Sequence, residues 1–507
     1  MKRWCCHALL TIAVGAAVVS PGPASALPPV DEPPVSGVVE GHPEPDFNRD
    51  GFADLAVGGD WESLPGDRSL GVVNVLYGSK TGLSKAPVQV FSERDFGPDI
   101  GSSFGFPLTT GDFDGDGFTD LAVGDNTAEV GDVGGAGAVR VIYGSTAGLT
   151  KQRSQVWSQG SPGIADTPEE DDYFGITLIA ANFGKGPQDD LAVAVRFEKN
   201  REGAVHVIYG SSTGLTSAGN QFWTQKSPGV PGKGESGDYF GSSLTAGNFG
   251  RSVHADLAIG VPGDTVGAKF AAGAVNVIYG SASGLTAAGS QRWTQNSRGI
   301  PGKAEDEDEL ARSLAAGHFA GTAYDDLAIG VAVENDYTGA VNIIYGSAKG
   351  LTSKNSQILT QATKGMGGVA EKGDLFGVAV ASANFGRDSG GGRYDDLAVG
   401  IPGEALSRRT SGAGTVQIIY GSRRGLNPAN DQIISQASRG ILGTAKQADE
   451  FGFCLTAHNF NRTGTSDLAI GAQGERSLNV VYGSAKGLTA SGNQMWSDIG
   501  YMTGGTL

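Results

Sequence analysis

The stretch that decides the fold runs from Asp112 to Gly124 and reads Asp-Phe-Asp-Gly-Asp-Gly-Phe-Thr-Asp-Leu-Ala-Val-Gly. Its second half, Asp-Leu-Ala followed by Val or Ile, is short, apolar and usually ended by glycine, which is typical of a buried strand. The same four residues recur along the chain, and the seven copies begin at Asp54, Asp120, Asp190, Asp256, Asp326, Asp396 and Asp467. This recurrence indicates a repeat architecture.

Each copy is followed by an alternating run that ends in Tyr-Gly-Ser. The seven tyrosines are Tyr77, Tyr143, Tyr209, Tyr279, Tyr345, Tyr420 and Tyr482. A Gly-Leu turn, a run that opens with glutamine and a run that opens with Phe-Gly complete the unit, so each repeat holds four short strands and little room for a helix. Seven such units predict an all-β, seven-bladed β-propeller with four-stranded blades, whose closure leaves only short strand edges exposed. A solenoid or β-helix is the structural alternative, although its repeats are usually shorter.

The first 45 residues differ in composition from the rest of the chain. Residues 1–26 read as a secretory signal peptide, with two basic residues, an apolar run Ala8–Val19 too short to span a membrane, and a cleavage site at Ala24-Ser25-Ala26. Residues 27–45 are rich in Pro and Glu and are expected to be an extended or disordered leader. The propeller is assigned to residues 46–507. We therefore expect a secreted, extracellular protein without a membrane span.

Closure of the ring has its own signature. The first repeat begins at its Asp46 loop and has no Phe-Gly run before it, whereas the tail 500–507 resembles the run that opens at Phe104. The sequence predicts that the tail supplies the missing strand of the first blade. The competing segment for that place is Val38-Val39.

Charge and cysteine usage narrow the function classes. The formal net charge of −17 argues against nucleic acid and anionic membranes as partners. Cys454 is the only cysteine outside the signal peptide, and its apolar neighbours predict a buried, inert thiol. We expect a monomer that packing and metal stabilise.

Two loops carry the pattern D-x-(D/N)-x-D-G-x-x-D, which suits Ca²⁺ because alternate residues of a tight loop can turn their oxygens inward. The predicted calcium ligands are Asp46, Asn48, Asp50, the Phe52 carbonyl and Asp54 in the first loop, and Asp112, Asp114, Asp116, the Phe118 carbonyl and Asp120 in the second. An EF-hand is excluded, since its position 12 needs Glu and here holds Val57 or Val123. The alternative is an Asx-rich turn without an ion.

The other five loops are poorer in acids. Those that start at Asn182 and Asn248 keep only the first and last positions, and those that start at His318, Asn384 and Asn459 are also depleted. We predict metal-free turns there, in which the last Asp caps backbone N–H groups.

Phe-Gly, then a D-x-D-x-D-G loop, then Asp-Leu-Ala-Val-Gly resembles the FG-GAP repeat of integrin α-subunit heads and of GPI-specific phospholipase D. The resemblance covers residues 46–507 and departs at the degraded loops and at Leu310-Ala311, where Phe-Gly is expected. It implies a seven-bladed propeller with calcium loops and, by analogy only, a binding or adhesion role.

Two function classes remain open. The first is a non-catalytic binding module for an extracellular protein or glycan. The second is an extracellular hydrolase or lyase that acts on polysaccharide or a phospholipid-glycan, with its site in the inter-repeat loops. These loops hold acid clusters, expected to form a solvated rim: Glu169 to Asp172, Glu235 with Asp238, Glu305 to Glu309, Glu371 with Asp374, and Asp449-Glu450. The tryptophans at one repeat position, Trp157, Trp223, Trp293 and Trp496, are expected to pack between blades rather than bind sugar.

Overall fold

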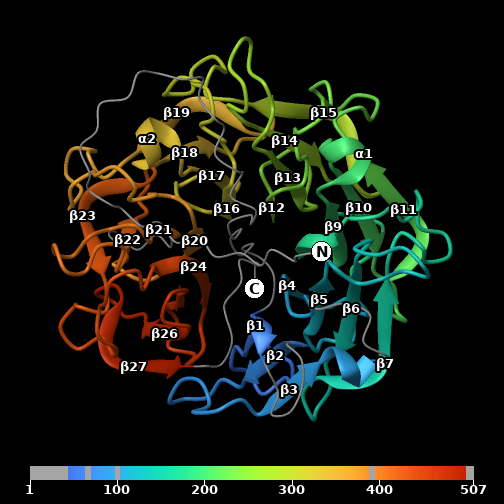
Figure 1. Ribbon diagram of the computed structural model, residues 1–507, viewed down its shortest axis with the longest axis horizontal. Coiled ribbons are helices and arrows are strands. Elements are labelled where there is room, and N and C mark those ends of the chain that lie inside the picture. Colours follow the sequence, from blue (N-terminus) through green and yellow to red (C-terminus); the bar gives the residue numbers. More distant parts are fainter. Residues whose placement is uncertain (1–43, 63–69, 97–102, 388–393, 498–507) are drawn as a thin grey trace, which may run out of the picture. The chain divides into compact units, whose positions relative to one another are not determined.

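The computed structural model describes residues 44–62, 70–96, 103–387 and 394–497. The predicted signal peptide, both segments proposed to complete the first blade, and most of the predicted leader lie outside these residues. Within them the chain forms antiparallel sheets whose strands follow one another in sequence order (Figure 1). Six sheets have four strands and one, in the first blade, has three described strands. The chain is therefore a seven-bladed β-propeller, as the repeats predicted.

The strand bounds follow the repeat. Blade 1 holds β1 (Leu55–Glu62), β2 (Leu70–Leu76) and β3 (Gln89–Ser92), followed by the 3-10 turn η1 (Glu93–Phe96). Blade 2 holds β4 (Leu108–Gly111), β5 (Asp120–Asp125), β6 (Ala138–Tyr143) and β7 (Thr150–Trp157); blade 3 holds β8 (Phe174–Ala181), β9 (Asp190–Val195), β10 (Ala204–Tyr209) and β11 (Thr216–Trp223). Blade 4 holds β12 (Leu244–Gly247), β13 (Asp256–Val261), β14 (Ala274–Tyr279) and β15 (Thr286–Trp293); blade 5 holds β16 (Ser313–Gly317), β17 (Asp326–Val331), β18 (Ala340–Tyr345) and β19 (Thr352–Leu359). Blade 6 holds β20 (Val380–Ala383), β21 (Asp396–Ile401), β22 (Thr415–Tyr420) and β23 (Asn427–Ile434); blade 7 holds β24 (Phe451–His458), β25 (Asp467–Ala472), β26 (Ser477–Tyr482) and β27 (Thr489–Ser497).

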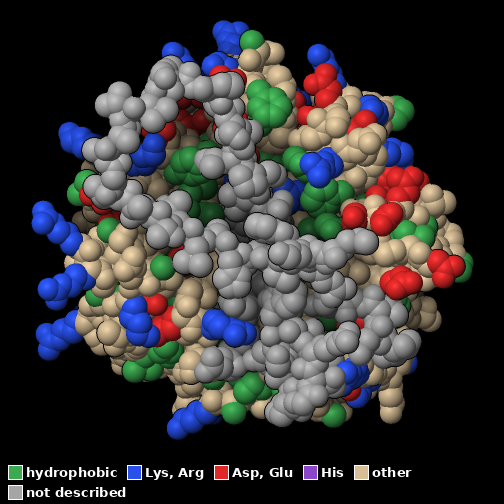
Figure 2. Space-filling model, viewed as in Figure 1, with side chains coloured by type: hydrophobic (Ala, Val, Ile, Leu, Met, Phe, Trp, Pro, Cys, Tyr) green, Lys and Arg blue, Asp and Glu red, His purple; other side chains and the backbone are tan. Residues whose placement is uncertain are grey.

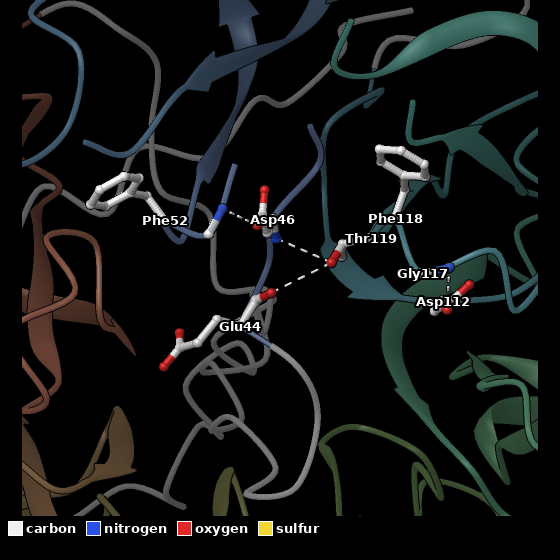
Figure 3. A pocket seen from close by; sticks show the side chains of 8 residues that line it. Glu44, Asp46, Phe52, Asp112, Gly117, Phe118 and Thr119 are labelled. Atoms are coloured by element: carbon white, nitrogen blue, oxygen red, sulfur yellow. Dashed lines mark hydrogen bonds between the residues drawn. The ribbon is translucent and has the colours of Figure 1, made fainter. Parts of the chain in front are cut away.

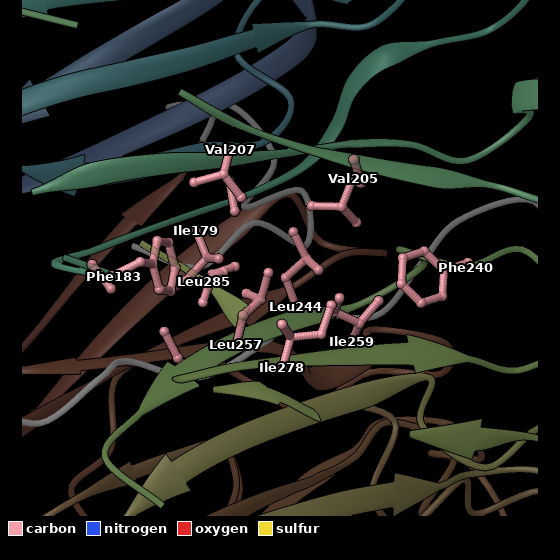
Figure 4. Close-up of a cluster of buried hydrophobic side chains, with 14 of the residues drawn as sticks. Ile179, Phe183, Val205, Val207, Phe240, Leu244, Leu257, Ile259, Ile278 and Leu285 are labelled. Carbon is pink, nitrogen blue, oxygen red and sulfur yellow. The ribbon is translucent and has the colours of Figure 1, made fainter. Parts of the chain in front are cut away.

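The two middle strands of each blade supply most of the core. From blade 2 to blade 7 every residue of these strands is buried, whereas the fourth strands are largely half-buried or exposed. Apolar side chains of adjacent blades interdigitate, as in the cluster between blades 3 and 4 that includes Ile179, Phe240, Leu257 and Ile278 (Figure 4). The tryptophans pack against such clusters, with Trp496 buried and the other three half-buried, which confirms their predicted place between blades.

A repeated hydrogen-bonded link joins successive blades and explains two repeat residues. The Tyr143 hydroxyl donates to Gln155 Oε1 at 2.6 Å, and Gln155 Nε2 donates to the Leu215 carbonyl of the next blade at 3.0 Å. The same two bonds recur in Tyr77–Gln89–Leu149, Tyr209–Gln221–Leu285, Tyr279–Gln291–Leu351, Tyr345–Gln357–Leu426, Tyr420–Gln432–Leu488 and Tyr482–Gln494–Leu83. The last of these joins blade 7 to blade 1, so the link closes the ring.

Two short turns depart from ordinary geometry. α1 (Glu198–Arg201) and α2 (Glu334–Tyr337) contain consecutive residues with left-handed dihedrals, such as φ 48° at Lys199 and 63° at Asn200. Non-glycine residues seldom adopt this conformation, because the Cβ atom crowds the following carbonyl oxygen. Both turns connect the second and third strands of their blades, in blades 3 and 5.

Two sequence-based predictions about single sites can be scored. Cys454 is buried and free, and burial raises the pKa of its thiol, as expected for an inert cysteine. Leu310 is buried where other repeats carry Phe, and Ala311 adopts φ 76° where they carry glycine. The fifth blade therefore keeps the repeat geometry despite its altered residues.

Candidate metal centre

The last aspartate of each loop is a structural cap in all seven repeats. Asp120 accepts the Phe113 N–H on Oδ2 at 2.9 Å and the Gly144 N–H on Oδ1 at 2.9 Å. The equivalent pairs of bonds occur at Asp54, Asp190, Asp256 and Asp396. Asp326 accepts the N–H groups of Ala320 and Gly346, and Asp467 accepts the Gly483 N–H on Oδ1 at 2.8 Å. This confirms the predicted capping role in the five poorer loops. It also explains why this Asp recurs in every repeat, since buried N–H groups need an acceptor.

The first three acidic or amide positions of the two rich loops form a matching set of hydrogen bonds. Asp46 accepts the N–H groups of Asp50 at 3.0 Å and of Gly51 at 2.7 Å, and Asn48 Oδ1 accepts the Asp50 N–H at 2.9 Å. The Phe52 N–H donates to Asp50 Oδ1 at 3.0 Å. These bonds draw the side chains of alternate residues toward the inside of a tight loop.

The second loop repeats this pattern with one more carboxylate. Asp112 accepts the N–H groups of Gly115 at 2.7 Å and Gly117 at 3.0 Å, and the Phe118 N–H donates to Asp116 Oδ1 at 3.0 Å. Gly117 adopts φ 84°, which supports the predicted sharp bend.

The carboxylates of the second loop form a cluster that suits a cation. One oxygen each of Asp112, Asp114 and Asp116 lies within 4.8 Å of the others, and Asp114 is buried. Burial raises the pKa of Asp112, and the negative charges of Asp114 and Asp116 raise it further. A bound cation would offset both effects, and three hard oxygen donors favour Ca²⁺ or Mg²⁺ over softer metals. The donor set therefore fits a hard divalent cation, of which Ca²⁺ is one.

Burial also acts on the capping aspartates of these two loops. It raises the pKa of Asp54 and of Asp120 to about 8, although the backbone N–H groups that they accept lower it. The negative charges of the other loop carboxylates contribute to the rise. Positive charge in either loop would thus favour the ionised form of the cap.

The two rich loops lie next to each other and enclose a surface hollow of about 300 Å³ (Figure 3). It is lined by Glu44, Asp46, Gly51, Phe52, Asp112, Gly117, Phe118 and Thr119. The Asp46 N–H donates to Thr119 Oγ1 at 3.1 Å, and the Thr119 N–H donates to the Asp46 carbonyl at 3.2 Å. The third loop holds the second in the same way, through mutual hydrogen bonds between Asp112 and Asp189.

Glu44 is a residue whose role the sequence did not reveal. It was assigned to the leader, yet its Oε2 accepts the Asn459 N–H at 3.1 Å and lies 3.2 Å from His458 Nδ1. It thereby joins the first loop to the last blade, where the ring closes. A single Glu in a Pro-rich segment carries no repeat signal that could have identified it.

The acid clusters of the inter-repeat loops differ from the expected solvated rim. In each loop one aspartate is buried and accepts the backbone N–H of the residue three positions before it, as Asp172 does from Glu169 at 2.8 Å. The others are Asp238, Asp308, Asp374 and Asp449. These carboxylates shape the loops, so the expectation of solvent-exposed acids was wrong for five of them.

Comparison with known proteins finds similarity to two kinds of protein. The chain is 33% identical to phosphatidylinositol-glycan-specific phospholipase D of Rattus norvegicus over 159 residues, which is 30% of this chain and 18% of that protein. It is 26% identical to integrin alpha-PS2 of Drosophila melanogaster over 258 residues, 50% of this chain and 16% of that protein. The FG-GAP resemblance is confirmed.

The matched regions cover less than a fifth of these relatives, so their activities and partners are not carried over to this chain. No protein-family model matches. Among solved structures, the Dos1 propeller aligns with a TM-score of 0.38 and 13% identity over 73% of this chain and 68% of its own. Among the described residues, no helix has the length and apolarity to cross a membrane.

Proposed function

We propose that this protein is a secreted, calcium-binding propeller that acts as a non-catalytic binding module for an extracellular protein or glycan. Calcium is bound by the first two loops through Asp46, Asn48, Asp50, Phe52 and Asp54, and through Asp112, Asp114, Asp116, Phe118 and Asp120. The similarity to an integrin α subunit and the carboxylate cluster support the metal. The relatives named above support an extracellular location.

The observation that carries the binding role is a cluster of residues that break the repeat. Tyr173, Phe197 and Tyr239 pack edge to face, with ring centroids 5.1 and 5.8 Å apart. The Arg196 guanidinium lies 4.7 Å from the Tyr239 ring, and that of Arg201 lies 5.7 Å from the Phe197 ring. Aromatic rings and arginine are the residues that most often carry binding energy in interfaces.

This aromatic–arginine cluster belongs to blades 3 and 4, at the end of the blades opposite the metal loops. Other repeats have Ser103, Glu309, Leu375 or Glu450 where Tyr173 and Tyr239 stand. Arg201 is exposed and presented by the left-handed turn α1, with φ 68°. The left-handed backbone itself recurs at this place in other blades, at Gly135, Ala271, Tyr337 and Gly412, so the departure from the repeat lies in the Arg201 side chain. The face that carries α1 is seen in Figure 2, where acidic side chains gather near β10 and β11 and basic ones project along the margin of β23.

A hydrolase or lyase is the second candidate, and the buried aspartates weigh against it. Paired carboxylates that hydrolyse glycosides must reach substrate. Here Asp172 and its four counterparts are buried and accept backbone N–H groups. The inter-repeat loops therefore use these acids for their own conformation.

Binding is tested with a glycan array and a pull-down of extracellular proteins, each with wild type and Arg201→Ala. The matched control is Arg298→Ala, an exposed arginine in the connection between blades 4 and 5. We expect Arg201→Ala to lose at least tenfold in affinity, as hot-spot arginines do, and the control to keep it. Turnover of a polysaccharide by wild type, lost on substitution of Glu170 or Glu235, would instead establish the enzyme.

Calcium is tested by calorimetry on the full chain. We expect two ions per molecule, and one after either Asp50→Ala or Asp116→Ala. Both residues are exposed, so these substitutions leave the core untouched. No uptake by wild type would refute the metal assignment.

A further inference from the structure

Basic side chains lie at one repeated place in the loops of three blades, each beside a tyrosine ring of its own blade. The Lys185 ammonium of the third loop lies 3.8 Å from the centroid of the Tyr209 ring and donates to the Gly219 carbonyl of β11. Arg387 of the sixth loop lies 4.4 Å from the Tyr420 ring and donates to the Asn430 carbonyl of β23 at 2.7 Å. In the fourth loop, Arg251 lies 4.5 Å from the Tyr279 ring. Each basic residue stands at position 4 of its loop.

These three loops have glycine at position 3, where the rich loops have Asn48 or Asp114. At Gly184 φ is 121°, and a Cβ atom would lie 1.8 Å from the Ser281 carbonyl oxygen of the next blade. A Cβ atom at Gly250 or Gly386 would likewise lie 1.9 Å from the carbonyl oxygen of Ser347 or Ser484 in a neighbouring blade. An acidic ligand therefore has no room at position 3, and a side-chain cation is present close by instead.

Blade 2 has the opposite arrangement: its loop carries an acidic residue, Asp114, at position 3, and the basic side chain comes from the fourth strand. Arg153 lies on β7 at φ 69°, at the bulge that Gly219 occupies on β11 with φ 70°. Its guanidinium lies 5.1 Å from the Tyr143 ring, and its Nη2 is 2.6 Å from Asp114 Oδ2. Asp114 is a predicted calcium ligand whose side chain is only 3% exposed. Here the fourth strand supplies the cation, and it binds a carboxylate of the metal loop.

We propose that Arg153 sets the calcium affinity of the second loop, by holding Asp114 and opposing the entry of a second positive charge. This inference rests on the calcium-binding function proposed above. Lys185, Arg251 and Arg387 replace a metal ion in blades 3, 4 and 6, whereas Arg153 competes with one in blade 2. Ligand charge is the property that tunes calcium affinity, so neutralisation of one carboxylate weakens the site.

The test is calorimetric titration of Ca²⁺ into Arg153→Gly in an Asp50→Ala background, where only the second loop responds. Glycine suits the left-handed backbone at this position, as it does at Gly219, so the variant is expected to fold. The matched control is Lys151→Ala, which removes a positive charge from the same strand that pairs with Asp95 and not with the loop. We expect Arg153→Gly to bind calcium about tenfold more tightly, the effect of one nearby unit charge, and Lys151→Ala to bind as the background does.

The outcomes separate this inference from the proposed function. Tighter binding by Arg153→Gly, or binding by that variant alone, supports it. Calcium uptake with equal or weaker affinity in Arg153→Gly overturns it and leaves the metal site standing. No uptake by any variant, including Arg153→Gly, overturns both.

Discussion

The link between blades can be broken at a single residue, Gln155, which joins blade 2 to blade 3. Its Oε1 accepts from the Tyr143 hydroxyl at 2.6 Å and from the Leu215 N–H at 3.1 Å, and its Nε2 donates to the Leu215 carbonyl at 3.0 Å. Gln155→Leu keeps a similar volume and removes these three bonds, together with the longer bond that Trp157 Nε1 donates to Gln155 Oε1 at 3.4 Å. At about 1 kcal/mol for each of the three shorter bonds, we expect a loss of about 3 kcal/mol in the free energy of unfolding.

Tyr143→Phe should cost much less, about 1 kcal/mol, because the Leu215 N–H keeps Gln155 as its acceptor. Urea denaturation followed by tryptophan fluorescence, with calcium held constant, measures both changes. The matched control is Gln152→Leu, an exposed glutamine on the same strand, which should stay within about 0.5 kcal/mol of wild type. If Gln155→Leu costs no more than Tyr143→Phe, the glutamine is not the centre of the link and the reasoning is wrong.

Three further predictions concern single residues. Burial lowers the pKa of His206 to about 4, whereas a histidine in the unfolded chain has a pKa near 6.5. The unfolded state therefore binds a proton first, and His206 should lower the free energy of unfolding by up to about 3 kcal/mol as the pH falls from 6.5 to 4. Urea denaturation at a series of acidic pH values should show a smaller loss of stability for His206→Asn than for wild type, and an equal loss would contradict this. Gly184→Ala should destabilise the protein by more than about 2 kcal/mol, because its Cβ would collide with the Ser281 carbonyl, whereas Gly134→Ala, with nothing within 4 Å, should melt like wild type. Cys454 should stay unmodified by a maleimide until the blades unfold, because it is buried and its thiol pKa is raised; mass spectrometry of the native protein would detect earlier reaction.

The sequence predicted the fold well because each blade element carries its own recurring residues. Asp-Leu-Ala marks the second strand, and Tyr-Gly-Ser marks the end of the third, as β5 and β6 show. Even the altered fifth repeat keeps Leu310 buried. Repetition made the assignment strong, since the second and third strands of each blade were each supported by six copies elsewhere in the chain.

Long-range partners were harder to predict, because contacts between blades join residues about 60 positions apart. The recurring glutamine was visible at Gln155, but nothing near it indicates that its partner is Leu215. A second set of links was missed for the same reason: Gln159 Nε2 donates to Glu198 Oε2 at 2.8 Å, and both are buried. Its counterparts are Gln225–Asp264, Gln295–Glu334, Gln361–Glu404 and Gln436–Glu475.

Residues that repeat and residues that do not repeat have different explanations in this molecule. A residue present in all seven repeats, such as Asp120 or Tyr143, satisfies a need that every blade has: to cap a turn or to hold its neighbour. A ligand that binds at one place needs residues found at one place, and these are the departures from the repeat. Arg153 departs at the metal loop and Arg201 at the opposite end of the blades, and at both places the left-handed backbone is shared by other repeats, as at Asn355 and at Tyr337. Several blades use the backbone conformation, but among the described residues no other blade carries an arginine at either place, so substitution of Arg153 and of Arg201 is the sharpest test of what this propeller binds.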